Sequence, residues 1–299
     1  MDYLEKLRRS AEKIGSIVCM GLDPVPEAMS ELKLDYWFKA EAFFEDILKE
    51  MKTQGVSPGA FKPNQGYYLR MDKPREGNFM GSRALANIMD LLDSEFPGIP
   101  IILDFKKGDV KKSSENYAVE GFDNWKADAV TVFPYMGTDS VSPFTDYCDK
   151  NAGRGVYILN RTSNEGAKDV QDLPLNTRDS GLDTLVYQQV AKKIVDWAKD
   201  RPGVGAVVGA TSKEELSDLA KFYAGKDIPL LIPNVGGQGG RADDVTAILR
   251  DSEYDLSLAR VNSSSGLTHP WKKAPAPRDY AKVCVAELNK LNEQIGYKP

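Results

Sequence analysis

Short runs of apolar residues alternate along the chain with longer segments that have the period of an α-helix. Eight such runs occur, at residues 16–24, 59–64, 99–105, 128–134, 155–160, 203–211, 228–234 and 256–264. Between them, segments such as 36–51, 83–96, 182–200 and 213–223 place apolar residues at i, i+3, i+4 and i+7. This alternation is typical of parallel strands joined by crossover helices. Eight units in 299 residues predict a closed (β/α)8 TIM barrel.

The first 15 residues, MDYLEKLRRSAEKIG, have the pattern of an amphipathic surface helix that precedes the first strand. They lack the apolar region of a signal peptide, and no run in the chain approaches the ~18 apolar residues of a membrane span. No linker-like change of composition divides the sequence. We therefore expect one barrel domain over residues 1–299 with an extra N-terminal helix, and no membrane partner.

Composition and charge narrow the class of protein further. The chain is 41% hydrophobic and 28% charged, as in globular proteins with a large core. Its net charge of -5 argues against nucleic acid as a partner, because phosphate-tracking proteins are usually basic. The three cysteines are odd in number and far apart, without a C-x-x-C pair, so neither a disulfide framework nor a zinc site is indicated. This usage favours the cytoplasm.

Polar residues stand where the apolar runs end. The carboxyl ends of barrel strands meet at one rim, which is where the active sites of such barrels lie. We therefore expect the following residues on one rim: Asp23, Lys62, Asn64, Asp104, Lys106, Arg161, Ser163, Thr211, Asn234, Gln238, and Asn262 with the serines that follow it.

The stretch LDFKKGDV concentrates charge at the end of the third run. Asp104 and Lys106 lie two residues apart and project to the same face of a strand, and a turn at Gly108 can bring Asp109 back toward them. Clustered charge beside an apolar core is costly unless it is paired, and such arrangements gather at functional sites. No capping or turn role explains a lysine between two acids, so this stretch is the first candidate for catalysis.

Some polar residues have a structural interpretation. Ser212 with Glu215 fits a capping box at the start of a helix. Ser113 or Ser114 can cap the helix that follows the third strand, with Asp109 near its positive end. For Asp109 taken alone, a structural and a functional role are equally compatible with the sequence.

Asp23 and His269 also have a structural interpretation. Asp23 precedes Pro24 and can simply organise a turn. His269 is the only histidine and has no neighbours at metal-ligand spacing, so we expect a surface residue rather than a ligand.

Loops supply the remaining candidates. The segment PNVGGQGGRADD follows the seventh run and precedes a helix, where backbone N–H groups can hold a phosphate. It is neither a G-x-G-x-x-G nor a P-loop motif, so a phosphorylated small molecule is the natural ligand. Two long polar loops, at residues 70–82 and 162–181, are candidate lids.

These segments together resemble one enzyme family. LDFKKGDV is similar to the DxKxxD signature of orotidine 5'-phosphate decarboxylase, in the longer variety found in bacteria and archaea. The segments that agree with it in order are GLDP, FKPNQGYY, VFPYMGTDSVSPF, NRTSN, VVGAT, IPNVGGQGG and VNSSSG. The resemblance spans nearly the whole chain and implies decarboxylation of orotidine 5'-phosphate to uridine 5'-phosphate, the last step of pyrimidine nucleotide synthesis.

The resemblance also implies roles for individual residues and a homodimer with shared active sites. Lys106 is the implied proton donor in a charged network, and no metal or organic cofactor is implied. The implied network comprises Lys62, Asp104, Lys106 and Asp109, with Asp109 and Ser113 reaching into the partner's site. The implied substrate contacts are Asp23 and Lys62 to the ribose, Ser163 to the pyrimidine edge, and Gln238, Gly239 and Gly240 to the phosphate.

One position departs from the family pattern. Where the family usually has an arginine that grips the phosphate, this chain has Ser265. A bidentate arginine–phosphate contact is a strong interaction, so substrate affinity is the property most affected, although Arg241 or Lys272 can supply a cation. Phe133 also replaces an asparagine often found before PYMG.

Two alternatives remain open at this point. Sister barrels with a DxKxxD run decarboxylate or aldol-cleave sugar phosphates with Mg²⁺, and a chelator would stop them. A non-catalytic barrel weakened in phosphate binding by Ser265 is the other alternative, and the intact DxKxxD run argues against it.

Overall fold

A computed structural model describes residues 1–29, 35–149, 152–175, 184–236, 240–271 and 275–299 of the chain. Its central feature is an eight-stranded sheet with the strand order β2-β1-β10-β9-β8-β5-β4-β3. The strands are β1 (Val18–Gly21), β2 (Ala60–Lys62), β3 (Ile102–Lys107), β4 (Ala129–Val132), β5 (Gly155–Arg161), β8 (Val204–Val208), β9 (Leu230–Ile232) and β10 (Ala259–Ser263). Each predicted apolar run overlaps one of them, and β3 and β5 continue one or two residues beyond their runs.

The sheet curls into a barrel. Every strand pair in it is parallel, and β1 pairs with β10, so the first and last strands of the chain are neighbours. The two ends of the sheet, β2 and β3, meet through the parallel bridges Phe61↔Ile101 and Asn64↔Asp104. The expected (β/α)8 TIM barrel is therefore confirmed.

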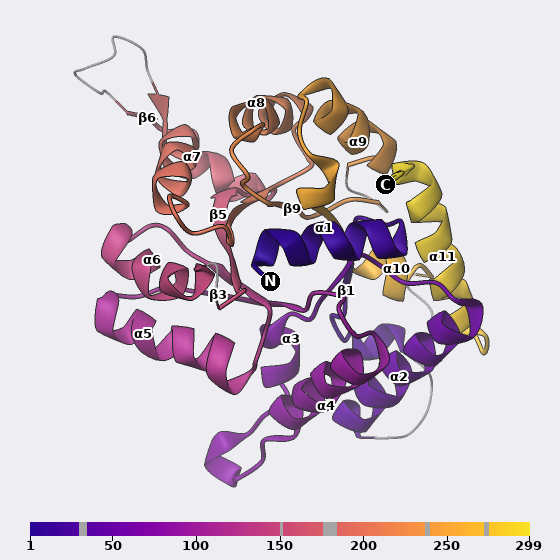
Figure 1. Ribbon diagram of the computed structural model, residues 1–299. Coiled ribbons are helices and arrows are strands. Elements are labelled where there is room, and N and C mark those ends of the chain that lie inside the picture. Colours follow the sequence, from indigo (N-terminus) through magenta and orange to yellow (C-terminus); the bar gives the residue numbers. More distant parts are fainter. Residues whose placement is uncertain (30–34, 150–151, 176–183, 237–239, 272–274) are drawn as a thin grey trace.

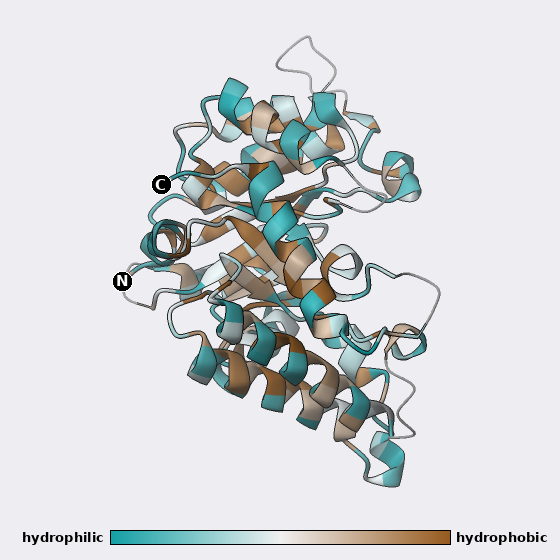
Figure 2. Cartoon of the chain, turned by 90° about the vertical axis from the view of Figure 1, so that its right-hand side faces the viewer, coloured by the Kyte–Doolittle hydropathy of each residue, from teal (hydrophilic) through white to brown (hydrophobic). Residues whose placement is uncertain are grey.

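Helices surround the strands (Figure 1). They are α1 (Tyr3–Ile14), α2 (Tyr36–Gln54), α3 (Gln65–Leu69), α4 (Met80–Glu95), α5 (Lys111–Val119), α6 (Thr138–Thr145), α7 (Val186–Trp197), α8 (Lys213–Tyr223), α9 (Ala242–Asp251), α10 (Ser265–Thr268) and α11 (Tyr280–Ile295). A small antiparallel pair, β6 (Pro174–Leu175) and β7 (Thr184–Leu185), precedes α7. Apolar strands fill the interior, and the hydrophilic residues gather on the outer helices (Figure 2).

Helix α1 covers the amino-terminal end of the barrel, as the position of its ribbon across the strands suggests (Figure 1). Ser10 donates to the carbonyl of Gly59 just before β2, and the Tyr3 hydroxyl donates to Tyr157 of β5. Arg260 of β10 is fully buried and donates to the carbonyl of Leu7 in α1. This end of the barrel is thus closed by packing and hydrogen bonds.

Three local predictions differ from the structure. Ser212 accepts from the Glu215 N–H as expected, but the Glu215 carboxylate binds Arg161 instead of returning to the cap, so the capping box is half formed. Helix α5 begins at Lys111, so Ser113 and Ser114 lie inside it and neither is its cap.

His269 is buried rather than on the surface, at 3% exposure. Its ring stacks on Phe43 with 5.3 Å between centroids, and burial lowers its pKa to about 4. The sequence LTHPW gave no sign of this because the covering aromatic residue comes from the distant helix α2.

Among the described residues, no helix is long and apolar enough to cross a membrane. The assignment of residues 1–299 to a single domain stays a prediction.

Candidate active site

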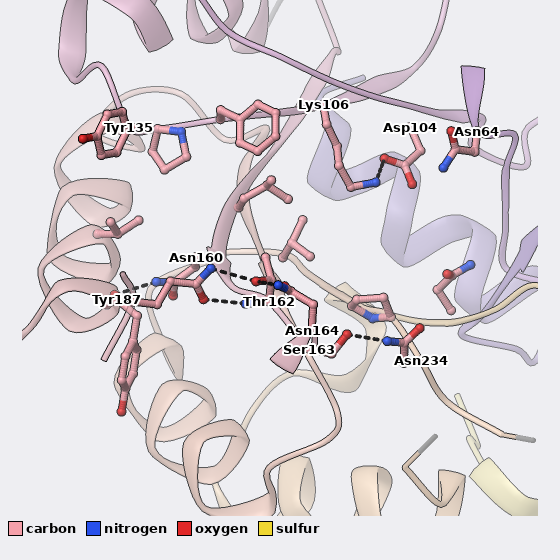
Figure 3. A pocket seen from close by; sticks show the side chains of 18 of the residues that line it. Asn64, Asp104, Lys106, Tyr135, Asn160, Thr162, Ser163, Asn164, Tyr187 and Asn234 are labelled. Atoms are coloured by element: carbon pink, nitrogen blue, oxygen red, sulfur yellow. Dashed lines mark hydrogen bonds and ion pairs between the residues drawn. The ribbon is translucent and has the colours of Figure 1, made fainter. Parts of the chain in front are cut away.

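A cavity of about 620 Å³ opens at the carboxyl ends of the strands. Most of the expected rim residues line it, and Figure 3 shows several of them converging on the same space. The expected residues that line it are Asp23, Lys62, Asn64, Asp104, Lys106, Ser163, Asn234 and Asn262. The rim is therefore formed by residues from six strand ends, as the alternating pattern predicted.

The centre of the site is a row of three charged side chains. The Asp104 carboxylate lies between two lysines, with Oδ2 2.8 Å from Lys62 Nζ and Oδ1 2.5 Å from Lys106 Nζ. The side chains of Asp104 and Lys62 are 7% and 5% exposed, whereas that of Lys106 is 42% exposed toward the cavity. Both ammonium groups thus reach the cavity, Lys62 from an almost buried position and Lys106 from a more exposed one.

Burial and neighbouring charge shift the pKa values of Asp104 and Lys62 in opposite directions. Burial alone would raise the pKa of Asp104, but Lys62 and Lys106 outweigh it and hold that pKa well below its usual range. Burial would likewise lower the pKa of Lys62, but the carboxylates of Asp104 and Asp23 raise it. Asp104 and Lys62 are therefore both charged near neutral pH.

Lys106 has an unusual backbone conformation. Its φ is +43°, in the left-handed region that non-glycine residues seldom adopt. The pairing of β3 with β4 shifts register between Leu103 and Lys107, as in a β-bulge. Bulges near active sites redirect side chains. The Lys106 N–H donates to Thr131 Oγ1 of β4 at 3.0 Å, which ties the distorted segment to the neighbouring strand.

Asp23 lies at the edge of the same cluster, beyond the end of β1. Burial raises its pKa, and Lys62 opposes that effect. Its Oδ1 is buried and has no hydrogen-bond partner among the described residues. A buried carboxylate oxygen without a partner is costly, so this atom is suited to accept a hydrogen bond from a ligand hydroxyl.

The loops after β5 and β9 meet at the opposite wall. Asn234 donates to the Ser163 hydroxyl (Figure 3). Asn234 has φ +63°, which asparagine tolerates better than most residues, and its carbonyl accepts from the Gly240 N–H at 2.9 Å. A Cβ on Gly240 would lie 2.6 Å from the carbonyl oxygen of Ala210, so the close approach requires glycine there. The glycine loop is thereby anchored beside Ser163.

Other predicted residues do not line the cavity. The Asp109 carboxylate accepts from the Val110 N–H, Ser113 lies in α5, and Ser265 is exposed at the start of α10. None of these three, nor Gly240, lines the cavity in the described part of the chain. Gln238, Gly239 and Lys272 lie outside the described residues.

Two expected rim residues, Arg161 and Thr211, do not line the cavity. Arg161 binds Glu215 of α8 through two hydrogen bonds of 2.9 and 2.8 Å, and its other donors reach Gln171 and Asp172. Arg161 therefore fastens the loop after β5 to a surface helix. Arg241 is likewise engaged, by Asp243 at 2.5 Å, so it is not free to replace the missing arginine without breaking that pair.

Sequence reasoning missed part of the wall. Ser264, one of the serines expected on the rim after Asn262, lines the cavity as predicted, whereas the following lining residues were not singled out for the rim: Tyr67, Phe133, Pro134, Tyr135, Leu159, Asn160, Thr162, Asn164, Val170, Gln171, Val186, Tyr187, Val190, Val207 and Pro233. Four of them, Thr162, Asn164, Val170 and Gln171, come from the second candidate lid, whereas none of residues 70–82 is among them. Their apolar members resemble ordinary core residues, so only the three-dimensional arrangement identifies them.

The arrangement offers fixed charge in a partly apolar cavity. An ammonium held beside a buried carboxylate can stabilise negative charge that develops on a ligand, and such interactions are strong where water is excluded. Among the described residues, no group of three His, Cys, Asp or Glu side chains is placed to hold a metal ion.

Comparison with known proteins is consistent across sequence and structure. A profile described as "Orotidine 5'-phosphate decarboxylase / HUMPS family" matches residues 16–261. Orotidine 5'-phosphate decarboxylase of Ralstonia pickettii is 33% identical over 298 residues, covering 98% of this chain and 99% of that protein. The protein of the same name from Cupriavidus metallidurans is 34% identical over 282 residues, covering 94% and 93%. The structure of Leishmania donovani OMP decarboxylase superposes with a TM-score of 0.71 at 26% identity, covering 98% and 99%.

Proposed function

Because the chain belongs to the orotidine 5'-phosphate decarboxylase / HUMPS family, we propose that it converts orotidine 5'-phosphate to uridine 5'-phosphate and CO2. The observation that carries this proposal is the pair formed by Lys106 and Asp104 at the cavity. It provides a fixed ammonium where the reaction needs a cation and a proton donor.

The chemistry explains why a lysine is needed there. Loss of CO2 from C6 of the pyrimidine leaves a carbanion in an sp² orbital, which cannot delocalise into the ring carbonyls. The Lys106 ammonium stabilises this charge electrostatically and then transfers a proton to the same carbon. The products are uridine 5'-phosphate, CO2 and a neutral amine that is reprotonated from solvent.

Asp104 has two roles in this proposal. Its carboxylate holds Lys106 and Lys62 in place, as their distances of 2.5 and 2.8 Å support. It also places negative charge near the substrate carboxylate, which favours departure of CO2. Lys62 keeps Asp104 ionised, and Lys62 with Asp23 binds the ribose hydroxyls, for which the unpartnered Asp23 Oδ1 is a suitable acceptor.

The remaining contacts orient the nucleotide. Ser163 reads the pyrimidine edge, and the loop that contains Gln238, Gly239 and Gly240 holds the phosphate. Support for this orientation comes from the Asn234–Ser163 hydrogen bond, which brings the two loops together. Ser265 stands where the family usually has a phosphate-binding arginine, so backbone N–H groups carry more of the phosphate interaction here.

We propose a homodimer with shared active sites, in which Asp109 and Ser113 contact the substrate bound to the partner. In support, two large apolar side chains that do not line the cavity are exposed: Val110, next to Asp109, at 58%, and Met136, in the loop after β4, at 45%. Exposed apolar patches of this kind mark protein interfaces.

We further propose a cytoplasmic enzyme that needs no metal or organic cofactor.

The decisive experiment is to follow the loss of orotidine 5'-phosphate absorbance after adding the purified protein, with and without EDTA. Turnover that EDTA leaves unchanged is the expected result. Turnover of a sugar phosphate that EDTA abolishes would favour the Mg²⁺-dependent sister activity. No turnover by folded protein at any substrate concentration would favour the non-catalytic barrel.

A further inference from the structure

Thr131 is a buried hydroxyl in an otherwise apolar strand. It is 1% exposed in β4, whose other residues are Ala129, Val130 and Val132. Valine has nearly the same shape and would fill the same space, so packing alone does not explain a hydroxyl here. A buried hydroxyl is retained at little cost only when it is hydrogen-bonded.

Both hydrogen bonds of the Thr131 hydroxyl are made to the ion pair of Asp104 and Lys106. Its Oγ1 accepts from the backbone N–H of Lys106 at 3.0 Å and donates to Asp104 Oδ1 at 2.8 Å. The directions are fixed by the partners, because an amide N–H can only donate and an ionised carboxylate can only accept. Thr131 therefore links the backbone of one member of the ion pair to the side chain of the other.

This link constrains the two features on which the ion pair depends. The Asp104 carboxylate can rotate about its terminal torsion, and Thr131 and Lys62 hold its two oxygens from opposite sides. The backbone of Lys106 has φ +43° at a register shift, a conformation that persists only where surrounding contacts enforce it. The bond from its N–H to Thr131 is such a contact.

We propose that Thr131 is a positioning residue for the decarboxylation, an inference that rests on the proposed function. It acts through Asp104 and Lys106 and does not line the cavity. Its removal should therefore change the geometry of the reacting ammonium without removing any contact to the bound nucleotide.

The test compares three variants. Thr131→Val keeps the shape and removes the hydroxyl, whereas Thr131→Ser keeps the hydroxyl and removes the methyl group. Thr145→Val is the matched control, because Thr145 is also 1% exposed but its hydroxyl donates to the carbonyl of Ser142 within α6, away from the ion pair. For each variant kcat, KM, the Kd for uridine 5'-phosphate and Tm are measured.

We expect Thr131→Val to lower kcat by roughly 10- to 100-fold, the loss typical of misplacing a catalytic group by about 1 Å. KM and the Kd for uridine 5'-phosphate should stay within about twofold, and Thr131→Ser should restore most of kcat. Thr145→Val should leave kcat unchanged. A kcat of Thr131→Val close to wild type, or equal losses in the valine and serine variants, would overturn the proposal.

A crystal structure of Thr131→Val separates this inference from the proposed function. Loss of the left-handed backbone at Lys106, or of its contact with Asp104, shows that Thr131 positions this ion pair, and an inactive wild-type protein would then contradict only the proposed function. An unchanged Lys106–Asp104 pair contradicts it even if the wild-type protein is active.

Discussion

The substitution Asp104→Asn tests whether the Asp104 carboxylate holds the two lysines Lys62 and Lys106 in place. It keeps the shape of the side chain and removes the negative charge between Lys62 and Lys106. Lys62 is then left as an ammonium only 5% exposed and without its partner. Removing one partner of a buried ion pair typically costs about 3–5 kcal/mol. The contact with Lys106 adds at most about 1 kcal/mol, because the Lys106 side chain is 42% exposed and solvent screens it.

A loss of about 4 kcal/mol can be converted into a melting temperature. At about 2.1 cal/mol/K for each of the 299 residues, the entropy of unfolding is roughly 0.6 kcal/mol/K, so Tm should fall by about 6 °C at pH 7. Turnover should be lost as well. The measurement is thermal unfolding followed by circular dichroism. The control is Asp196→Asn, which removes a carboxylate paired with Lys199 on the exposed surface of α7 and should leave Tm nearly unchanged.

The pH dependence gives an independent check. The pKa of Asp104 is lower in the folded protein than in the unfolded chain, so its stabilisation is present above about pH 4 and is lost as the pH falls further. The pKa of Lys62 is raised, so its contribution is present below about pH 10 and is lost as the pH rises above that value. The Tm difference between wild type and Asp104→Asn should be constant from about pH 5 to 9 and narrow below pH 4. A difference of less than about 2 °C at pH 7, or one that widens in acid, would refute this reasoning.

Three further outcomes are expected. Lys106→Ala should lower kcat by at least about 10³-fold while Tm stays near that of wild type. A kcat near the wild-type value would show that Lys106 is not the proton donor. Ser265→Arg should lower KM for orotidine 5'-phosphate by roughly tenfold if the position faces the phosphate, whereas an unchanged KM would mean that another group already binds it. If active sites are shared, mixing unfolded Lys106→Ala and Asp109→Ala chains and refolding them together should restore about a quarter of wild-type activity, because half of the dimers then carry one intact site. An inactive mixture that contains the mixed dimer would contradict sharing.

The sequence predicted the barrel because each strand is a short apolar run that ends in a polar residue. Val18–Gly21 and Val204–Val208 are buried along their whole length, and each lies inside a predicted apolar run. The same rule located Asp23, Lys62, Asp104 and Lys106, since residues that end neighbouring parallel strands must meet at one rim. Periodicity and topology were sufficient for these positions.

The remaining features depend on contacts between residues that are far apart in the chain. Arg161 also ends a strand, but a carboxylate of α8 draws it away from the rim. Thr131 looks like any β-branched strand residue until its hydroxyl is seen between β3 and β4. His269 is covered by a helix more than 200 residues earlier in the sequence. No local pattern encodes such pairings, so sequence reasoning could not identify them.

The pairing of β1 with β10 has a consequence for synthesis of the protein on the ribosome. Asn262 of β10 donates to the carbonyl of Cys19 in β1, across 243 residues of chain. At about 5–20 residues per second, β1 waits roughly 12–50 s for this neighbour, with the unpaired edge of a buried strand exposed meanwhile. The wall that joins Asp23 to Ser264 can form only after that interval, so a ribosome-bound chain shorter than about 260 residues has no complete active site, however much of the barrel has already folded.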